Sequence, residues 1–253
     1  MVTSSIRRLQ GGAADELDAP RPWGAHDCEQ GWPLLSGAHV NKDDRQPEVA
    51  GRAGGRRQEY AEATRQAIVS AARRLFAEKG YFSTRVEDIA AEARVAPATV
   101  YAVCGGKYEL LKTLVDLWQT SPTIAATLDD LAQLDDPVQI IRVLSERTRQ
   151  IREEYSDIIK TVLGTAPNDQ AVFGTLQEVI ARYRGAIDEV SQRLAALKGL
   201  RRGTDVQFAT DVLWFYFGFS GLSAMHDENG WSYDDAEKWL ADEAMRTLLA
   251  DTE

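Results

Sequence analysis

Side chains that donate hydrogen bonds or carry a positive charge are concentrated between residues 84 and 107 of the chain. Arginine and lysine bind phosphate oxygens and base edges, and hydroxyl groups donate to the same acceptors. The candidates are Arg85, Arg94, Thr99, Tyr101 and Lys107. Such a set is suited to binding a nucleic acid, provided that local structure brings these side chains to one face.

Residues for catalysis or metal binding are sparse by comparison. His226 is the only histidine after residue 55, it has no Glu three positions before it, and no Ser, Cys or Lys nucleophile motif is present. The two cysteines, Cys28 and Cys104, are too few for a disulfide framework or a cysteine metal site. We therefore expect no enzyme, no catalytic residue, no metal site and no cofactor.

The charge is distributed unevenly along the chain. The 253 residues carry a net charge of −10, which on average disfavours a nucleic-acid partner. Residues 52–112 nevertheless hold 11 basic and 7 acidic residues, a net of +4, whereas residues 1–51 carry −3 and residues 113–253 carry −11. This division indicates a small anion-binding module joined to an acidic body that does not touch the anion.

The first 55 residues differ from the rest in composition. They hold 8 of the 19 glycines and 4 of the 8 prolines without any apolar period, which predicts a disordered arm. A start assigned too far upstream would give the same pattern. The longest apolar run, Val212–Met225, has about 14 residues against the roughly 20 that cross a bilayer, and no signal-peptide core is found. We expect a cytoplasmic protein without a membrane partner.

Helical periodicity begins near residue 59 and predicts three helices before residue 106. They span about 59–79, 84–93 and 97–104, and the second begins at a capping box headed by Thr84. A turn of about three residues joins the last two, which is the spacing of a helix-turn-helix. If Arg94 in this turn adopts a left-handed conformation, the cost is about 1 kcal/mol relative to glycine.

The remainder is predicted to be helical as well, so the fold class is all-α. Further helical runs are expected over about 107–120, 137–162 with a break near Tyr155, 168–194, 204–219 and 232–248, with a weak segment up to Leu134. No stretch alternates with a period of two for long enough to form a strand. The segment Trp214–Phe219 is apolar nearly all round, and we expect it to be buried on nearly all sides.

A specific set of residues is spaced along the positive segment, from about residue 60 to 112. Its members are Ala72, Phe76, Gly80, Tyr81, Thr84, Ile89, Ala90, Val95, Thr99, Val100, Tyr101, Lys107, Glu109, Leu110 and Leu111. In these residues and their spacing the chain resembles the TetR family of transcriptional regulators. It departs from the family pattern at Arg94, Ala96, Ala98 and Val103-Cys104, which bears on which bases are read more than on the fold.

The resemblance implies a three-helix helix-turn-helix DNA-binding domain at 56–106 and a helical bundle for ligand binding and dimerisation at 107–253, after the arm at 1–55. It implies a repressor that binds a near-palindromic operator in double-stranded DNA as a homodimer, under the control of a small-molecule effector that the sequence does not identify. The alternative is a helical ligand-binding or interaction protein of the same fold that has lost specific operator reading. The lack of side-chain donors at Ala96, Pro97 and Ala98 motivates this alternative.

The expected site residues fall into three groups. The expected DNA contacts are Thr84, Arg85, Arg94, Pro97, Ala98, Thr99, Tyr101 and Lys107. The aromatic residues expected around a ligand cavity are Trp118, Tyr155, Phe173, Tyr183, Phe208 and Trp214. The residues expected at the dimer interface are Phe215, Phe219, Leu222, Trp239, Leu240, Met245 and Leu248. Packing within the protomer is the alternative role for the aromatic and apolar residues, and helix capping is an additional role for Thr84.

Overall fold

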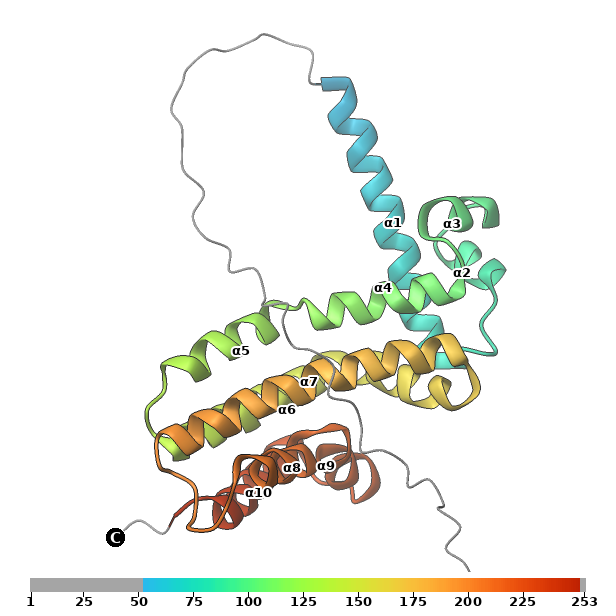
Figure 1. The fold of residues 1–253 in the computed structure, drawn as a ribbon. Helices are drawn as coiled ribbons and strands as arrows, with labels where there is room; N and C mark the ends of the chain where they lie inside the picture. Colours follow the sequence, from blue (N-terminus) through green and yellow to red (C-terminus); the bar gives the residue numbers. More distant parts are fainter. Residues whose placement is uncertain (1–51, 251–253) are drawn as a thin grey trace, which may run out of the picture. The chain divides into compact units, whose positions relative to one another are not determined.

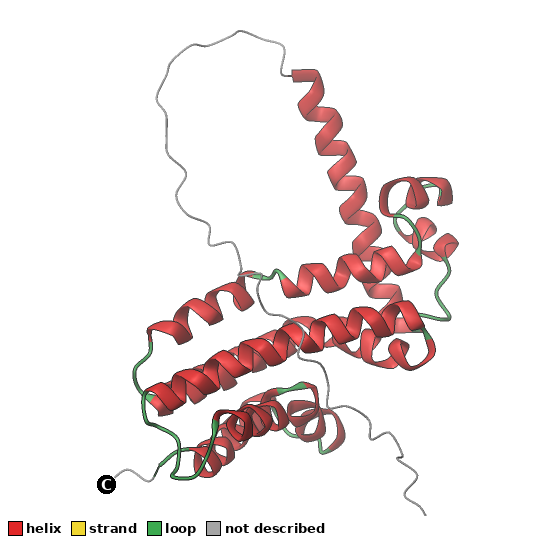
Figure 2. Cartoon of the chain, in the orientation of Figure 1, coloured by secondary structure: helices red, strands yellow, loops and turns green. Residues whose placement is uncertain are grey.

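The computed structural model describes residues 52–250, with side chains from residue 55 onwards. All regular structure in this range is helical, apart from one isolated antiparallel bridge between Leu200 and Leu249 (Figures 1 and 2). The all-α class is therefore confirmed. The expected arm falls almost entirely within residues 1–51, which lie outside the described residues.

The helices appear in the order expected from periodicity. They are α1 (Arg52–Lys79), α2 (Val86–Glu92), α3 (Pro97–Cys104), α4 (Lys107–Gln119), α5 (Pro122–Gln133), α6 (Pro137–Thr165), η1 (Ala166–Asn168), α7 (Gln170–Ala196), α8 (Val206–Phe217), α9 (Phe219–Ser223), η2 (Ala224–Glu228) and α10 (Tyr233–Leu248). The segment η1 is a 3-10 turn and η2 is π-helical. Within residues 52–250, none of these helices has the length and apolar character to cross a membrane.

Helix α1 starts at Arg52, earlier than the expected start near Glu59. Residues 52–55, which were expected to belong to the arm, are therefore helical. The side chains of residues 55–63 are exposed. Because the Arg, Gln and Glu residues between 56 and 62 extend an existing helix at low cost, this part of the helix continues although its side chains are exposed. Hydrophobic periodicity cannot detect such an extension, since no apolar stripe marks it.

Helix α2 starts one residue later than a cap at Thr84 requires, so the expected capping box is wrong. The N-cap is Arg85, whose backbone N–H donates to Oδ2 of Asp88 at 3.1 Å. The Thr84 hydroxyl is buried and lies 2.8 Å from the carbonyl of Gly80 and 3.1 Å from that of Leu75. Its single proton satisfies a free carbonyl at the end of α1, which is an alternative to capping the next helix.

Two clusters of buried side chains hold the helices together. The first contains side chains from the four helices α1, α2, α3 and α4, from the second half of α6 and from the start of α7. Phe76, Ile158 and Val172 are examples. The second joins α5, the first half of α6, the end of α7, α8 and α10, for example Ile141 with Leu213. The N-terminal helices therefore share a core with α6 and α7.

Candidate nucleic-acid interface and effector region

The turn between α2 and α3 contains a residue in the left-handed conformation. Arg94 has a φ of 58°, so the condition under which the sequence assigned it a cost of about 1 kcal/mol relative to glycine is met. The next residue, Val95, donates its N–H to the carbonyl of Ala90 at 2.9 Å, which closes the turn onto α2. Helix α3 follows with Ala96 as its N-cap and Pro97 at its first position, where the missing N–H of proline costs nothing.

We expect an Arg94→Gly variant to be more stable than the wild type by about 0.5–1 kcal/mol. Glycine adopts positive φ without the steric cost of a Cβ, and part of that gain is offset by its larger entropy in the unfolded chain. Urea unfolding gives the difference. An Arg94→Ala variant is the control, because it removes the same side chain but keeps the strain, and equal stability of the two variants would contradict the argument.

Helix α3 is anchored on one side and exposed on the other. Val100 and Cys104 are buried in the first core cluster. Pro97, Ala98 and Tyr101 lie on the outward face, and the Tyr101 side chain is 55% exposed. A helix of this kind, held by its inner face beside a second short helix, is the element that enters the major groove in helix-turn-helix proteins.

Two arginines of the expected contact set stand close to the short helices along the chain. Arg85, just before α2, and Arg94, just before α3, are both exposed. Within residues 52–250, neither guanidinium forms a hydrogen bond or an ion pair. Both arginines are therefore free to bind a phosphate or a base edge, the contacts assigned to them from sequence. Thr99, another member of the expected set, is half-buried.

Lys107 is fixed at the start of α4 by its own contacts. Its Nζ donates to the carbonyl of Tyr81 at 2.8 Å and lies 4.3 Å from the centroid of the Tyr81 ring. Burial lowers the pKa of this lysine from its ordinary value, although Asp169 acts in the opposite direction. An ammonium group has three N–H donors, so two remain for a phosphate after the bond to Tyr81.

The structure gives Thr84 a role other than DNA contact, and it shows one further exposed residue near Lys107, Phe82. The Thr84 hydroxyl faces the interior and uses its proton there, so it has none for a phosphate. Phe82 is exposed, and its ring centroid lies 6.0 Å from Nζ of Lys107. Phe82 was not among the expected contacts; the available signal was a second aromatic residue, two positions after the helix-ending Gly80 and outside any apolar stripe.

The same segment of the chain matches a family model. Residues 68–114, from the middle of α1 to the middle of α4, match the model for bacterial regulatory proteins of the tetR family. The N-terminal domain belongs to the TetR family. The TetR domain contains every residue of the exposed face described above, from Phe82 to Lys107.

Solved structures share the fold over most of the chain that carries this TetR domain. NalD of Pseudomonas aeruginosa, described as the secondary repressor of the MexAB-OprM multidrug efflux pump, is 22% identical, with 77% of this chain and 100% of that chain covered and a TM-score of 0.61. A putative transcriptional regulator from Saccharomonospora viridis in complex with choline is 19% identical, with 74% and 98% covered and a TM-score of 0.62. The fatty acid degradation regulator FadR from Bacillus halodurans is 16% identical, with 72% and 94% covered and a TM-score of 0.61. No curated protein sequence matches the chain.

Three of the six aromatic residues expected around a ligand form one cluster, with rings from α4, α7 and α8. The rings of Trp118, Tyr183 and Trp214 surround Phe219, with centroids 6.1, 6.0 and 5.8 Å from its ring. Phe219, which was expected at the dimer interface, is half-buried in this ring cluster, and its place at an interface stays a prediction. The indole N–H of Trp118 is buried and has no hydrogen-bond partner within the described residues.

The other three expected ligand contacts lie elsewhere. Tyr155 is buried at a kink in α6, where its φ of −123° and ψ of 15° are not helical, so the expected break there is confirmed. Phe173 on α7 and Phe208 on α8 are 43% and 51% exposed. Phe173 and Phe208 are thus more exposed than the rings around Phe219, of which Trp118 is buried and Tyr183 and Trp214 are half-buried.

The kink in α6 is bound directly by an arginine of the TetR domain. Arg73 of α1 donates to both carboxylate oxygens of Asp157, at 2.6 and 2.8 Å, and to the backbone carbonyl of Glu154 at 2.6 Å. Burial acts to raise the pKa of Asp157, but the hydrogen bonds and charge of Arg73 outweigh it and hold that pKa below its ordinary value. The kinked segment is thereby tied to α1. No sequence motif marks either residue.

The residues expected at a dimer interface divide into exposed and buried ones. Phe215 is 68% exposed and Trp239 is 38% exposed, so both are open to a partner. The expectation that the Trp214–Phe219 segment is buried on nearly all sides is therefore wrong, because one face of α8 packs against α10 and α7 while Phe215 points away. Met245 is half-buried. Three of the expected interface residues are buried in the core of the protomer: Leu222, Leu240 and Leu248.

Proposed function

We propose that the chain is a DNA-binding transcriptional regulator, a repressor whose affinity for its operator is controlled by a small-molecule effector. The observation that carries this proposal is the outward face of α3 in a TetR domain, flanked by the unpaired cations Arg85 and Arg94. Since its target is chromosomal DNA, the protein acts in the cytoplasm. The relatives of the same fold are described as regulators, which supports a role without catalysis.

The proposed division of DNA contacts follows from the chemistry of each side chain. Pro97 and Ala98 at the tip of α3 contact thymine methyl groups, since they have no side-chain donor. Tyr101 and Lys107 donate to phosphates and fix the register of the helix in the groove. Arg85 supplies a further phosphate or base contact from the start of α2.

We further propose that the regulator is a homodimer through α8 and α10. One helix-turn-helix makes few contacts, so tight and specific binding requires a second copy on the next half-site. Exposed aromatic side chains on a protomer mark surfaces that a partner covers. Phe208 and Phe215 on α8 and Trp239 on α10 provide such a surface, and it lies in the acidic part of the chain, away from DNA.

Two routes connect the proposed effector region to the TetR domain. Helix α4 has Lys107 at one end and Trp118 of the aromatic cluster at the other, so it can act as a lever between them. The contacts of Arg73 with Asp157 and Glu154 join α1 to the kink of α6. An effector changes operator affinity only through its different affinity for the two arrangements of these helices.

A second candidate function keeps the fold without operator reading. The observation in its favour is the tip of α3, where Ala96, Pro97 and Ala98 present no hydrogen-bond donor from a side chain. A ligand-binding or interaction protein of this fold would bind DNA weakly and without sequence preference, which the following experiment detects.

A gel-shift titration with DNA from around the chain's own gene tests the proposal. We expect saturable binding to one fragment and at least 100-fold weaker binding to a scrambled version. A Lys107→Met variant should bind all sequences more weakly, with the slope of log affinity against log salt reduced by about 1, because one phosphate contact is lost. Lys238→Met, at an exposed lysine of α10, is the matched control and should change neither quantity.

Equal affinity for the scrambled fragment would favour the second candidate function. An unchanged salt slope in a folded Lys107→Met variant would remove this lysine from the interface, and helical circular dichroism verifies that the variant is folded.

A further inference from the structure

Arg152 is a buried cation in the middle of α6 without an anionic partner. The residue is 5% exposed. One guanidinium nitrogen donates to the carbonyl of Gly218 at 2.8 Å, and its central carbon lies 4.8 Å from the centroid of the Phe219 ring. Within residues 52–250, no carboxylate pairs with it. A guanidinium has five N–H donors, so most of those on Arg152 have no acceptor from the protein.

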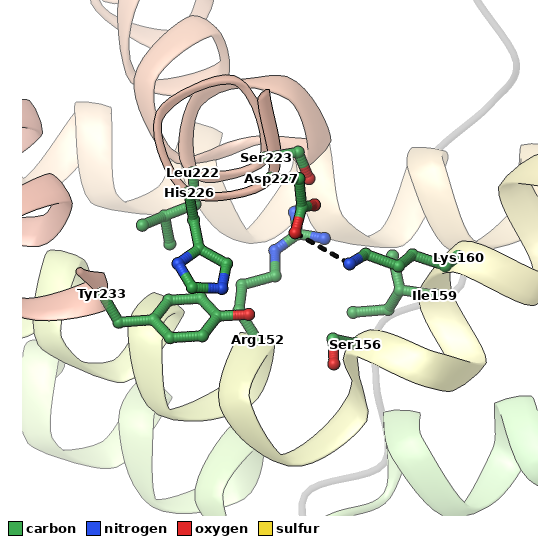
Figure 3. A pocket seen from close by; sticks show the side chains of 9 residues that line it. All are labelled: Arg152, Ser156, Ile159, Lys160, Leu222, Ser223, His226, Asp227 and Tyr233. Atoms are coloured by element: carbon green, nitrogen blue, oxygen red, sulfur yellow. Dashed lines mark hydrogen bonds and ion pairs between the residues drawn. The ribbon is translucent and has the colours of Figure 1, made fainter. Parts of the chain in front are cut away.

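The guanidinium borders a small cavity between α6 and the α9–η2 segment (Figure 3). The cavity has a volume of about 10 Å³, enough for about one water molecule or a group of similar size. Ser156, Ser223 and Tyr233 line it, and the apolar side chains of Leu222 and Ile159 lie on opposite sides of Arg152 (Figure 3). The cavity therefore combines polar residues, a positive charge and apolar side chains.

The other charges at the cavity cancel. Lys160 of α6 donates to Oδ1 of Asp227 at 2.8 Å, which joins α6 to η2 across the mouth of the cavity. The ring of His226 stacks on Tyr233 at 3.7 Å, and its Nδ1 lies 2.8 Å from the carbonyl of Trp231. Arg152 forms no ion pair within residues 52–250; burial lowers the pKa of its guanidinium, and the charge of Asp227 acts in the opposite direction.

A buried, unpaired charge is costly to the folded protein, and an anion of the opposite charge relieves that cost. A planar carboxylate matches the two parallel N–H groups of an arginine better than a spherical ion does. Because one guanidinium at the cavity lacks an ion pair, the best match is an anion with a single negative charge. The apolar side chains at the cavity and the adjacent Phe219 favour a hydrocarbon tail next to that anion.

We propose that this cavity binds the carboxylate group of a monocarboxylate with an apolar tail, and that Arg152 is its partner. The proposal rests on the proposed function and deepens it by naming the chemical class of the effector. The tail extends along Ile159 and Leu222 toward Phe219, whose ring lies against the guanidinium.

The location of the site suits an effector. Arg152 lies three residues before the kink at Tyr155, and Arg73 of the TetR domain binds the carbonyl of Glu154 in the same turn. The opposite wall is α9 and the π-helical η2, a type of irregularity that often occurs at functional sites. Admitting the carboxylate and its tail requires α9–η2 to move relative to α6. In the proposal, this movement changes the packing on the turn of α6 that Arg73 binds.

Isothermal titration calorimetry of the full-length chain with hexanoate tests the proposal, in a chloride-free buffer at pH 7. We expect saturable binding with a dissociation constant of about 1 mM or tighter, and no binding of hexanamide, which has the same tail without the charge. An Arg152→Gln variant should bind hexanoate about 10- to 100-fold more weakly, the usual effect of losing a charge-assisted hydrogen bond. Arg152→Lys keeps the charge but loses the paired N–H donors. Its affinity for hexanoate should lie between that of the wild type and that of Arg152→Gln.

The matched control is Arg184→Gln, which removes another guanidinium that lies over an aromatic ring, 5.3 Å from the centroid of Trp214, outside this cavity. It should bind hexanoate as the wild type does. Absence of hexanoate binding by the wild type, equal binding by folded Arg152→Gln, or tighter binding of inorganic phosphate would each overturn the proposal. A gel shift of the same preparations without hexanoate distinguishes the two proposals. If the wild type does not bind the operator but binds hexanoate, the proposed function is overturned and the carboxylate site is not.

Discussion

An Ala98→Glu variant is expected to lose operator binding by on the order of 100-fold while it remains folded. Ala98 is exposed near the N-terminus of α3, the end that enters the groove in the proposed complex. A carboxylate there meets DNA phosphates, and juxtaposed like charges cost several kcal/mol. The same carboxylate is favourable to the helix itself, because the N-terminus of a helix carries a partial positive charge.

Thermal unfolding and a gel shift on the same preparation separate the two effects. Ala126→Glu, at an exposed alanine of α5, has the same change in charge and is the matched control, with operator affinity expected to stay within about twofold of the wild type. Operator binding by Ala98→Glu at wild-type strength would mean that α3 does not enter the groove by this end.

An Arg73→Met variant is expected to be less stable than the wild type by about 2 kcal/mol at pH 7. It removes three hydrogen bonds from charged N–H groups and leaves the partly buried carboxylate of Asp157 and the carbonyl of Glu154 without this partner. The magnitude includes a reduction for solvent screening, since the two side chains are 36% and 30% exposed. Urea unfolding measures it.

The contribution of Arg73 should depend on pH in one direction. The pKa of Asp157 is lower in the folded protein than its ordinary value of 3.8. The stabilisation is therefore fully present above that ordinary value and is lost as the pH falls through the lower folded pKa. The difference between wild type and Arg73→Met should shrink below about pH 4. Arg74→Met is the matched control, because Arg74 forms an exposed ion pair with Glu92 and surface pairs contribute about 0–1 kcal/mol. Equal losses in the two variants would contradict a specific role for Arg73.

The helices and the helix-turn-helix could be predicted from local sequence signals. Apolar period, the proline at the start of α3 and the glycine after α1 are local features, and each acts within a turn or two of its own position. The left-handed backbone of Arg94 could be raised only as a possibility, because Arg94 stands at a turn position where the family that the chain resembles usually has glycine. The start of α1 could not be predicted, because an exposed extension leaves no apolar pattern.

The roles of individual side chains depended on distant parts of the chain. Phe215 and Phe219 are four residues apart in one aromatic run, yet one points to solvent and the other lies within a ring cluster, since the helix ends at Gly218 between them. The cap expected of Thr84 was replaced by bonds to carbonyls that only the tertiary turn brings near. A single sequence offers no signal for either choice.

Arg152 could have been noticed from the sequence alone. It follows Leu144 and Thr148 at four-residue spacing on the buried stripe of α6, where a cation is out of place. What could not be predicted was the absence of an acidic partner, because that depends on how α9 and η2 pack against α6. Arg73 and Asp157, 84 residues apart, left no local signal at all.

A footprint of the wild-type protein on DNA from around its own gene tests the central claim most directly. We expect two protected blocks on a near-palindromic sequence, with their centres about 10 base pairs or a small multiple of that apart, because two copies of α3 must enter the major groove on one side of the duplex. Protection that is uniform along the fragment, or that is equal on a scrambled fragment, would contradict it.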